Sequence, residues 1–362
     1  MLKRKTIFTL LLPILLSFYF YTNRSTLWGS IITYISKKEH PNFISYGRFI
    51  NSSTRTKVNG RLSPTTGTLL KPLLISRIIE TENHKLAREF IADSLKGLGW
   101  DVYIHEAEMD TALGVKTFRN IIATKYPQAK DKIVLSAHYD TNPVLGTTFV
   151  GAIDSALPCA MLLDLAIEMN DYLNDKVELS LQLVFFDGEE ALQSWSSTDS
   201  IYGARLLARD AKLNLVPNFK IEDIKLLVLL DLLGAPRPFF AQLIAKTGKE
   251  YKRLRFIEKS LRNEGLLFDD GENEYFRDYQ AFNSVEDDHI PFLELGVKVL
   301  HIIDYIPYEF MGYAQSLGRR EFPSVWHTLN DDENAIDSKT TWNLSILIKV
   351  FVFDYIENVN KK

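Results

Sequence analysis

Apolar and polar residues alternate with two different periods along most of the chain. Residues 82–100 repeat apolar side chains at the spacing of one helical face. Residues 132–141 and 179–186 are short apolar runs of the kind that buried strands form. By the same criteria we expect further helices over residues 151–169, 250–265 and 340–359, and further strands over residues 100–109, 118–126, 224–233 and 297–304.

This order of elements predicts a fold class. Strands that read as continuous apolar runs and alternate with helices are typical of a mostly parallel sheet whose faces are covered by helices. We therefore expect an α/β domain over residues 76–362, with a central mixed, mostly parallel sheet flanked by helices.

The first 75 residues follow another pattern. Residues 6–22 carry no charge and, as a helix, would span about 25 Å at ~1.5 Å per residue, close to the ~30 Å core of a bilayer. No alanine precedes Ala87, so an A-x-A cleavage site is absent. We expect a cytoplasmic tip and signal anchor over residues 1–22 and a polar stem over residues 23–75.

The basic residues before this segment predict its orientation. Lys3, Arg4 and Lys5 would stay cytoplasmic, so the rest of the chain would face the lumen of the Golgi or the ER as a single-pass type II membrane protein. A cleaved signal peptide, which would give a secreted or vacuolar protein, and a buried apolar helix are the alternatives. Sequons at Asn23, Asn51 and Asn343 suggest a glycoprotein, and Asn51 carries most of that weight.

Composition narrows the class of protein only a little. The 362 residues are 46% hydrophobic and 24% charged, which is ordinary for a globular protein. The net charge of −4 argues against nucleic-acid binding. Cys159 is the only cysteine, so no intramolecular disulfide forms. Nothing in the sequence requires a partner subunit, and we expect a monomer.

Four predicted strands end in acids or histidines. A single aspartate after a strand is usually a turn or helix-cap residue. The carboxyl ends of parallel strands, however, meet at one edge of a sheet, where ligands bind. Four such strand ends together therefore predict a site built from the residues that follow the strands: His138, Asp140, Asp187, Glu189, Glu190, Asp231 and His301.

These side chains are the kind that bind zinc, which accepts nitrogen and oxygen ligands. Glu189 and Glu190 are adjacent and cannot both reach one metal with equal geometry. One would bind the metal, and the other would remain beside it as a proton shuttle. The candidate ligands, which together have the content of a two-zinc site, are His138, Asp154, Glu190, Asp231 and His327.

Five segments in this order resemble the glutaminyl-peptide cyclotransferases, or glutaminyl cyclases, which are relatives of the zinc aminopeptidases. The resemblance covers the chain from about Glu80 to its end. It implies a zinc aminopeptidase-like α/β fold and the conversion of N-terminal glutamine of peptides to pyroglutamate with release of ammonia. The segments are residues 149–166, 179–195, 226–236, 286–303 and 322–337.

The resemblance also implies roles for single residues. One Zn²⁺ per chain would fall on Asp154, Glu190 and His327. The catalytic set would be Glu189 as general acid/base, Asp287 as second carboxylate and Asp231 as third member of the proton network. The substrate-binding residues would be Trp195, Trp326, Phe322, Glu286 and His301.

Three positions depart from the pattern of that family. Ala137 stands where many members have a cysteine that pairs with the equivalent of Cys159, so this disulfide is lost. Glu286 stands where a glutamine is common. Residues 304–323, just before His327, are longer than usual and could reshape the mouth of the pocket.

Two other functions fit the same residues. A zinc aminopeptidase would use all five candidate ligands, including His138 and Asp231, to hold two ions, and Glu189 would activate a water molecule. A non-catalytic, membrane-tethered binding relative would need none of this chemistry. The intact set of Glu189, Asp154, Glu190 and His327 argues against that last reading.

Overall fold

The computed structural model describes residues 52–174, 177–272, 274–282 and 285–359. The expected anchor, most of the expected stem and the sequons at Asn23 and Asn51 lie outside these residues. Among the helices of the described ranges, none combines the length and the apolar character needed to cross a membrane.

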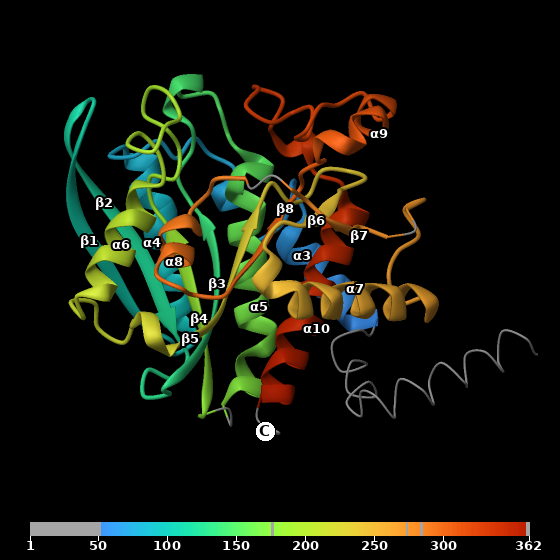
Figure 1. Cartoon of the computed structure of the whole chain (residues 1–362), viewed down its shortest axis with the longest axis horizontal. Coiled ribbons are helices and arrows are strands. Elements are labelled where there is room, and N and C mark those ends of the chain that lie inside the picture. Colours follow the sequence, from blue (N-terminus) through green and yellow to red (C-terminus); the bar gives the residue numbers. More distant parts are fainter. Residues whose placement is uncertain (1–51, 175–176, 273, 283–284, 360–362) are drawn as a thin grey trace, which may run out of the picture. The chain divides into compact units, whose positions relative to one another are not determined.

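A mixed sheet forms the centre of the described part of the chain (Figure 1). Its strand order is β1-β2-β4-β3-β5-β8. The pairings of β4 with β3, β3 with β5 and β5 with β8 are parallel, whereas both pairings of β2 are antiparallel. The predicted α/β class with a mixed, mostly parallel sheet is therefore confirmed. The strands are β1 Asp101–Thr111, β2 Gly114–Thr124, β3 Asp131–His138, β4 Leu179–Phe186, β5 Ile224–Asp231 and β8 Val299–Ile303.

Helices cover both faces of this sheet. On one face, α6 and α8 pack on apolar side chains such as Val134, Val184 and Leu227. On the other face, α4 and α5 pack on the strands, and α10 packs on α5. A small parallel pair, β6 Phe240–Gln242 and β7 Phe276–Gln280, lies apart from the main sheet. The helices are α3 Ser52–Leu62, α4 Glu82–Gly97, α5 Leu157–Leu173, α6 Tyr202–Lys212, α7 Gly248–Asn263, α8 Ile290–Glu294, α9 Met311–Ser316 and α10 Ser338–Val359.

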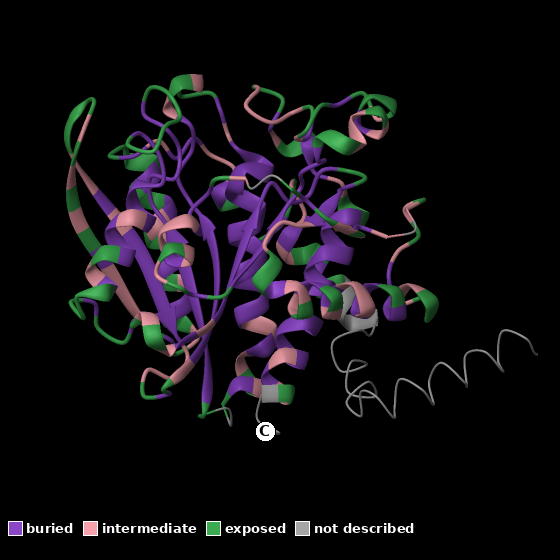
Figure 2. Cartoon of the chain, viewed as in Figure 1, coloured by how far each residue is buried: buried purple, intermediate pink, exposed green. Residues whose placement is uncertain are grey.

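Burial explains why the strands differ in their sequence patterns. Every residue of β4 is buried, because β4 has a neighbour on each side and helices on both faces, so its sequence is an unbroken apolar run. β1 is an edge strand whose residues alternate between more and less exposed positions. Figure 2 shows this contrast between the buried centre of the sheet and the exposed end of the β1–β2 hairpin.

The structure also describes the end of the expected stem and the third sequon. The described end of the expected stem contains α3, which packs against α5 and α10. Asn343, in the third sequon, is fully buried in α10, where its amide accepts from the backbone N–H of Phe268 and donates to the carbonyl of Phe268. This asparagine is therefore not a glycosylation acceptor in the folded protein.

A buried ion cluster joins α3, α5 and α10. The carboxylate of Asp164 accepts from Nη1 of Arg61 at 2.8 Å, from Oγ of Ser345 at 3.0 Å and from Nζ of Lys349. Burial raises the pKa of Asp164, but Lys349 and Arg61 lower it more, so the net shift is downward from 3.8. The ionised carboxylate is thus the form that the fold stabilises.

Replacing Asp164 by asparagine is expected to lower the free energy of unfolding by about 3–5 kcal/mol at pH 7, because Lys349 is left buried without a counter-charge. Because the folded-state pKa is depressed, this contribution is complete at neutral pH and is lost as the pH falls through the folded pKa, below 3.8. Urea unfolding of both proteins at pH 7 and in acid measures it. The double variant Asp164→Leu/Lys349→Met should recover most of the lost free energy of unfolding. Equal stability of wild type and Asp164→Asn at pH 7 would contradict the stabilising role of the ionised Asp164.

Candidate active site

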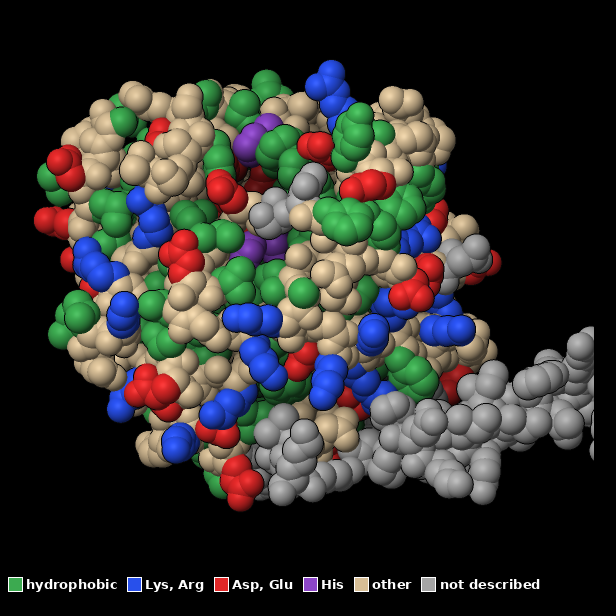
Figure 3. Space-filling view, in the orientation of Figure 1, with side chains coloured by type: hydrophobic (Ala, Val, Ile, Leu, Met, Phe, Trp, Pro, Cys, Tyr) green, Lys and Arg blue, Asp and Glu red, His purple; other side chains and the backbone are tan. Residues whose placement is uncertain are grey.

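A pocket of about 380 Å³ opens at the edge of the sheet where β4, β5 and β8 end. Figure 3 shows histidine and acidic side chains at a hollow in this face of the molecule. The pocket brings together ten of the predicted site residues from segments far apart in the sequence. Its lining consists of Asp154, Glu189, Glu190, Trp195, Asp231, Leu232, Val285, Glu286, Asp287, Ile303, Phe322, Trp326 and His327.

Asp154, Glu190 and His327 form a triad that fits a metal ion. Nε2 of His327 lies 3.6 Å from Oδ2 of Asp154 and 3.4 Å from Oε1 of Glu190. These two oxygen atoms are buried and have no hydrogen-bond partner among the described residues. Ligands at ~2.0 Å from a tetrahedral zinc lie about 3.3 Å from one another. The spacing and the unpartnered atoms therefore fit a zinc ion.

A second triad shares Asp154 but is arranged differently. Nε2 of His138 lies 2.9 Å from Oδ1 of Asp154 and 3.4 Å from Oδ1 of Asp231. Burial lowers the pKa of His138, but hydrogen bonds to Asp140, Asp154 and Asp231 raise it well above its ordinary value. In this second triad His138 hydrogen-bonds directly to Asp154, whereas in the first triad Asp154 and Glu190 each keep one oxygen unpartnered toward His327.

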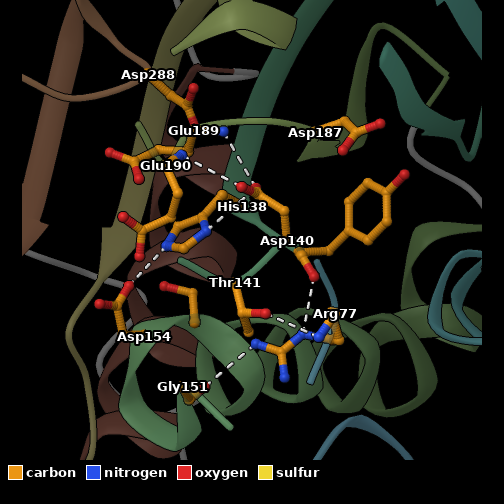
Figure 4. A network of polar contacts seen from close by, with 12 residues as sticks. Arg77, His138, Asp140, Thr141, Gly151, Asp154, Asp187, Glu189, Glu190 and Asp288 are labelled. Atoms are coloured by element: carbon orange, nitrogen blue, oxygen red, sulfur yellow. Dashed lines mark hydrogen bonds and ion pairs between the residues drawn. The ribbon is translucent and has the colours of Figure 1, made fainter. Parts of the chain in front are cut away.

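Asp140 fixes the backbone of the two adjacent glutamates. Its carboxylate accepts from the backbone N–H of Glu189 at 3.1 Å and of Glu190 at 3.2 Å (Figure 4). Gly188 precedes them with a φ of 64°, and a Cβ there would lie 2.3 Å from the ring of Phe118. The turn after β4 therefore requires glycine, and it presents two consecutive carboxylates with fixed and different directions.

Glu189 is the acid of the pocket with the most perturbed environment. It is 6% exposed, and burial raises its pKa well above the ordinary value. The positive charge of His138 opposes this shift, while Glu190, Asp287 and Asp288 add to it. A buried carboxyl with a raised pKa beside a metal site is typical of a general acid/base.

Asp287 lies on another wall and is held by two donors. Its Oδ1 accepts from the backbone N–H of Asp288 at 2.6 Å, and its Oδ2 lies 2.8 Å from Nε2 of His301. Burial raises its pKa, and Asp231 adds to that effect. His301 is fully buried against His289 and does not line the pocket. Its place is behind Asp287 rather than in contact with a ligand.

Aromatic side chains form the rest of the lining. The ring of Phe322 lies 4.3 Å from that of Trp326, which stacks on the imidazole of His327 at 4.1 Å. Trp195 is 42% exposed and donates from Nε1 to Oε2 of Glu286 at 3.2 Å. These contacts place an indole beside the metal triad and a second indole at the rim.

Arg77, which carried no sequence signal, supports the loop that presents Asp154. Its guanidinium is buried and donates to five carbonyls, including those of Tyr139 at 2.8 Å, Val150 at 2.8 Å and Gly151 at 3.2 Å (Figure 4). Gly151 has a φ of 58°, and a Cβ there would lie 2.1 Å from the carbonyl oxygen of Asp154. Arg77 therefore fixes the backbone immediately before a metal-binding candidate.

Replacing Arg77 by lysine is expected to weaken zinc binding about 10- to 100-fold, because one ammonium cannot hold five carbonyls and the loop before Asp154 loses its support. Competition with a chromophoric chelator measures this affinity. The matched control is Arg253→Lys, at an arginine that pairs with Asp354 between α7 and α10. Equal zinc affinities of wild type and Arg77→Lys would show that Arg77 does not support the site.

Comparison with known proteins adds independent information. The chain matches the family model described as Peptidase family M28 over residues 120–352. The glutaminyl-peptide cyclotransferase of Drosophila melanogaster is 42% identical over 297 residues, which cover 78% of this chain and 78% of that protein. The glutaminyl-peptide cyclotransferase of Bos taurus is 39% identical over 307 residues, which cover 79% of this chain and 80% of that protein.

Solved structures show the same relationship. The crystal structure of Macrostomum lignano glutaminyl cyclase is 35% identical with a TM-score of 0.72, covering 85% of this chain and 93% of that one. A Zn-dependent exopeptidase from Parabacteroides distasonis shares the fold at 21% identity and a TM-score of 0.64, covering 83% of this chain and 99% of that one.

Proposed function

Because the chain belongs to the glutaminyl-peptide cyclotransferases within peptidase family M28, we propose that the pocket at the sheet edge closes the N-terminal glutamine of peptides into pyroglutamate and releases ammonia. The observation that carries this proposal is the arrangement of the triad of Asp154, Glu190 and His327, the buried carboxyl of Glu189 and two indoles around a pocket of about 380 Å³. One zinc ion per chain would be held by Asp154, Glu190 and His327. When bound, this ion would polarise the γ-carbonyl of the substrate glutamine.

The reaction needs one proton to be moved, and Glu189 is placed to move it. The nitrogen of the uncharged α-amine forms a bond to the γ-carbonyl carbon, and the bond from that carbon to the amide nitrogen breaks. Glu189 takes the proton that the amine loses and gives it to the departing nitrogen, so that ammonia leaves and the enzyme is restored. The raised pKa of Glu189 suits a group that must both accept and donate a proton.

Asp287 and Asp231 complete the set of carboxylates that we assign to catalysis. Asp287 is oriented by His301 and by a backbone N–H, which leaves further lone pairs of its oxygen atoms for the N–H groups of the substrate amine. Asp231 accepts from Oγ of Ser155 at 2.5 Å, and although burial raises its pKa, hydrogen bonds from His138 and Ser155 lower it more. It would therefore stay ionised beside Asp287 and hold the network in place.

The pocket walls favour cyclisation over hydrolysis. Trp326 and Phe322 cover the metal triad on one side, and Trp195 lies at the rim. A substrate between these rings would displace water from the reacting carbon. The nucleophile is part of the substrate, so no water needs to be activated. The hydrogen bond between His138 and Asp154 also favours a single metal site over the two-zinc site of an aminopeptidase.

We also propose that the enzyme acts in the lumen of the secretory pathway as a single-pass type II membrane protein and as a monomer. The support is the uncharged segment over residues 6–22 with its basic flank. Protease protection of the folded domain in sealed microsomes would test the orientation, and digestion without detergent would overturn it.

Incubating the purified zinc-loaded domain with an equimolar mixture of a Gln-initiated and a Leu-initiated peptide tests the proposed reaction. Mass spectrometry should show the loss of one ammonia from the Gln peptide and no change in the Leu peptide. Release of free leucine would instead identify an aminopeptidase. If zinc binds and neither peptide changes, the proposed reaction is wrong.

A further inference from the structure

The segment of residues 304–323 forms a lobe (Figure 1), and Phe322 of this lobe lines the active-site pocket. It contains α9, which packs on the small β6–β7 sheet through an apolar cluster that includes Phe239, Ile306, Phe310 and Ala314. The lobe is therefore a folded part of the domain with its own apolar contacts.

Arg319 fastens the end of this lobe. Its guanidinium makes two contacts with the buried carboxylate of Asp304, at 2.9 and 3.1 Å, and donates to the carbonyl of Phe322 at 3.1 Å. The backbone N–H of Ile306 donates to the carbonyl of Glu321 at 2.7 Å. These bonds tie the two ends of the lobe together and fix the backbone around Phe322.

A second cavity of about 730 Å³ lies against the lobe, which we call the lobe groove. Phe322 and Trp326 line both this groove and the active-site pocket. These two rings thus form a wall that the two cavities share. A peptide whose first residue fills the pocket can leave it across this wall, and the groove is then the hollow that receives its next residues. Other residues of the groove are Gln315, Gly318, Arg320 and Ser324.

Arg320 is an exposed cation that lines this groove. Unlike Arg319, it makes no ion pair with any described residue. Glu321 also lines the groove; it too is exposed and makes no ion pair with any described residue, so it is the free anion beside Arg320. Arg320 is therefore the unpaired cation that an acidic side chain in the groove would meet.

The distance from Arg320 to the pocket corresponds to only a few residues of an extended peptide. Arg320 and Phe322 are two residues apart, so their Cα atoms are separated by at most about 7 Å. An extended peptide advances about 3.3 Å per residue. The side chains within reach of Arg320 are thus those of the second or third residue after the N-terminal glutamine.

We propose that the lobe is a recognition element for the substrate: its groove binds the residues that follow the N-terminal glutamine, and Arg320 selects an acidic side chain at the second or third of them. This inference rests on the proposed cyclisation. It adds a substrate class, namely peptides that carry an aspartate or glutamate close behind the glutamine.

A matched set of peptides tests the inference. The set is Gln-Ala-Glu-Glu-Ala, Gln-Ala-Lys-Lys-Ala, Gln-Ala-Ala-Ala-Ala and the dipeptide Gln-Ala, which is too short to reach Arg320. For wild type, kcat/KM should be about threefold to tenfold higher for the Glu peptide than for the Lys peptide, mostly through KM, and the difference should shrink at high salt. Arg320→Ala should abolish this preference, Arg320→Lys should retain its sign, and Arg320→Glu should reverse it.

The dipeptide separates the inference from the proposed function. It should be cyclised equally by wild type and by all Arg320 variants. If it is not cyclised by wild type, the proposed function fails. If it is cyclised and Arg320→Glu keeps the wild-type preference, the role of Arg320 is overturned. Lys259→Glu, a charge reversal at an exposed residue of α7, should leave the preference unchanged and controls for net charge.

Discussion

Replacing Glu189 by glutamine is expected to lower kcat for cyclisation by about 10²- to 10⁴-fold and to leave zinc binding unchanged. The amide has the shape of the carboxyl group but cannot take up and return a proton. The backbone N–H of Glu189 that binds Asp140 is retained, and the side chain is not part of the metal triad. Ammonia release measures kcat, and atomic absorption measures bound zinc.

A control in the same pocket separates proton transfer from a general loss of charge. Glu286→Gln removes the exposed carboxylate that accepts from the indole of Trp195. It should change KM and leave kcat almost unaltered. Full activity of Glu189→Gln would mean that another group carries the proton and that the assignment of Glu189 is wrong.

Replacing His327 by alanine is expected to weaken zinc binding by more than about 100-fold, which exceeds the 10- to 100-fold effect of losing a group that only supports a ligand. Two buried carboxylates, Asp154 and Glu190, would then face each other without the imidazole. Chelator competition gives the affinity. His138→Gln is the matched control and should retain one tightly bound zinc, because its ring contacts Oδ1 of Asp154 and not the Oδ2 that faces His327.

The same triad predicts how zinc affinity depends on pH. Burial lowers the pKa of His327, but Glu190 and Asp154 raise it more, to about 9. Burial raises the pKa of Glu190 to about 7. In the metal-free protein these groups therefore hold protons at neutral pH, and a metal must displace them. The affinity for zinc should fall about tenfold per pH unit for each displaced proton as the pH drops below these values.

Retention of wild-type zinc affinity by His327→Ala would exclude His327 as a ligand.

Several features of the fold could be predicted because their causes are local. The strand over residues 179–186 is continuous and apolar because every one of its residues is buried. The helix α6 was not predicted, although it packs on the core. It begins after Ile201, which has a φ of 45° and no capping side chain, so the usual signal of a helix start is missing. The three residues of β6 are too few to show a period.

The residues of the site also divide into those with a local sequence signal and those without one. Glu189, Glu190 and Asp231 could be predicted because they follow apolar strands directly. The support from Arg77 could not, because its five partners are backbone carbonyls that have no sequence signature. His301 lies in β8, and its contact with Asp287 depends on how the segment that carries Asp287 packs against that strand. No local sequence pattern indicates this packing.

The measurement that tests the central claim most directly is a zinc titration of the metal-stripped protein with a Gln-initiated peptide as substrate. Ammonia release should rise linearly and reach its plateau at one zinc per chain, with no amino acid released from a Leu-initiated peptide at any point. A plateau at two zinc ions per chain, or leucine release that appears with a second ion, would contradict a single-zinc cyclase and place the reaction with the aminopeptidases.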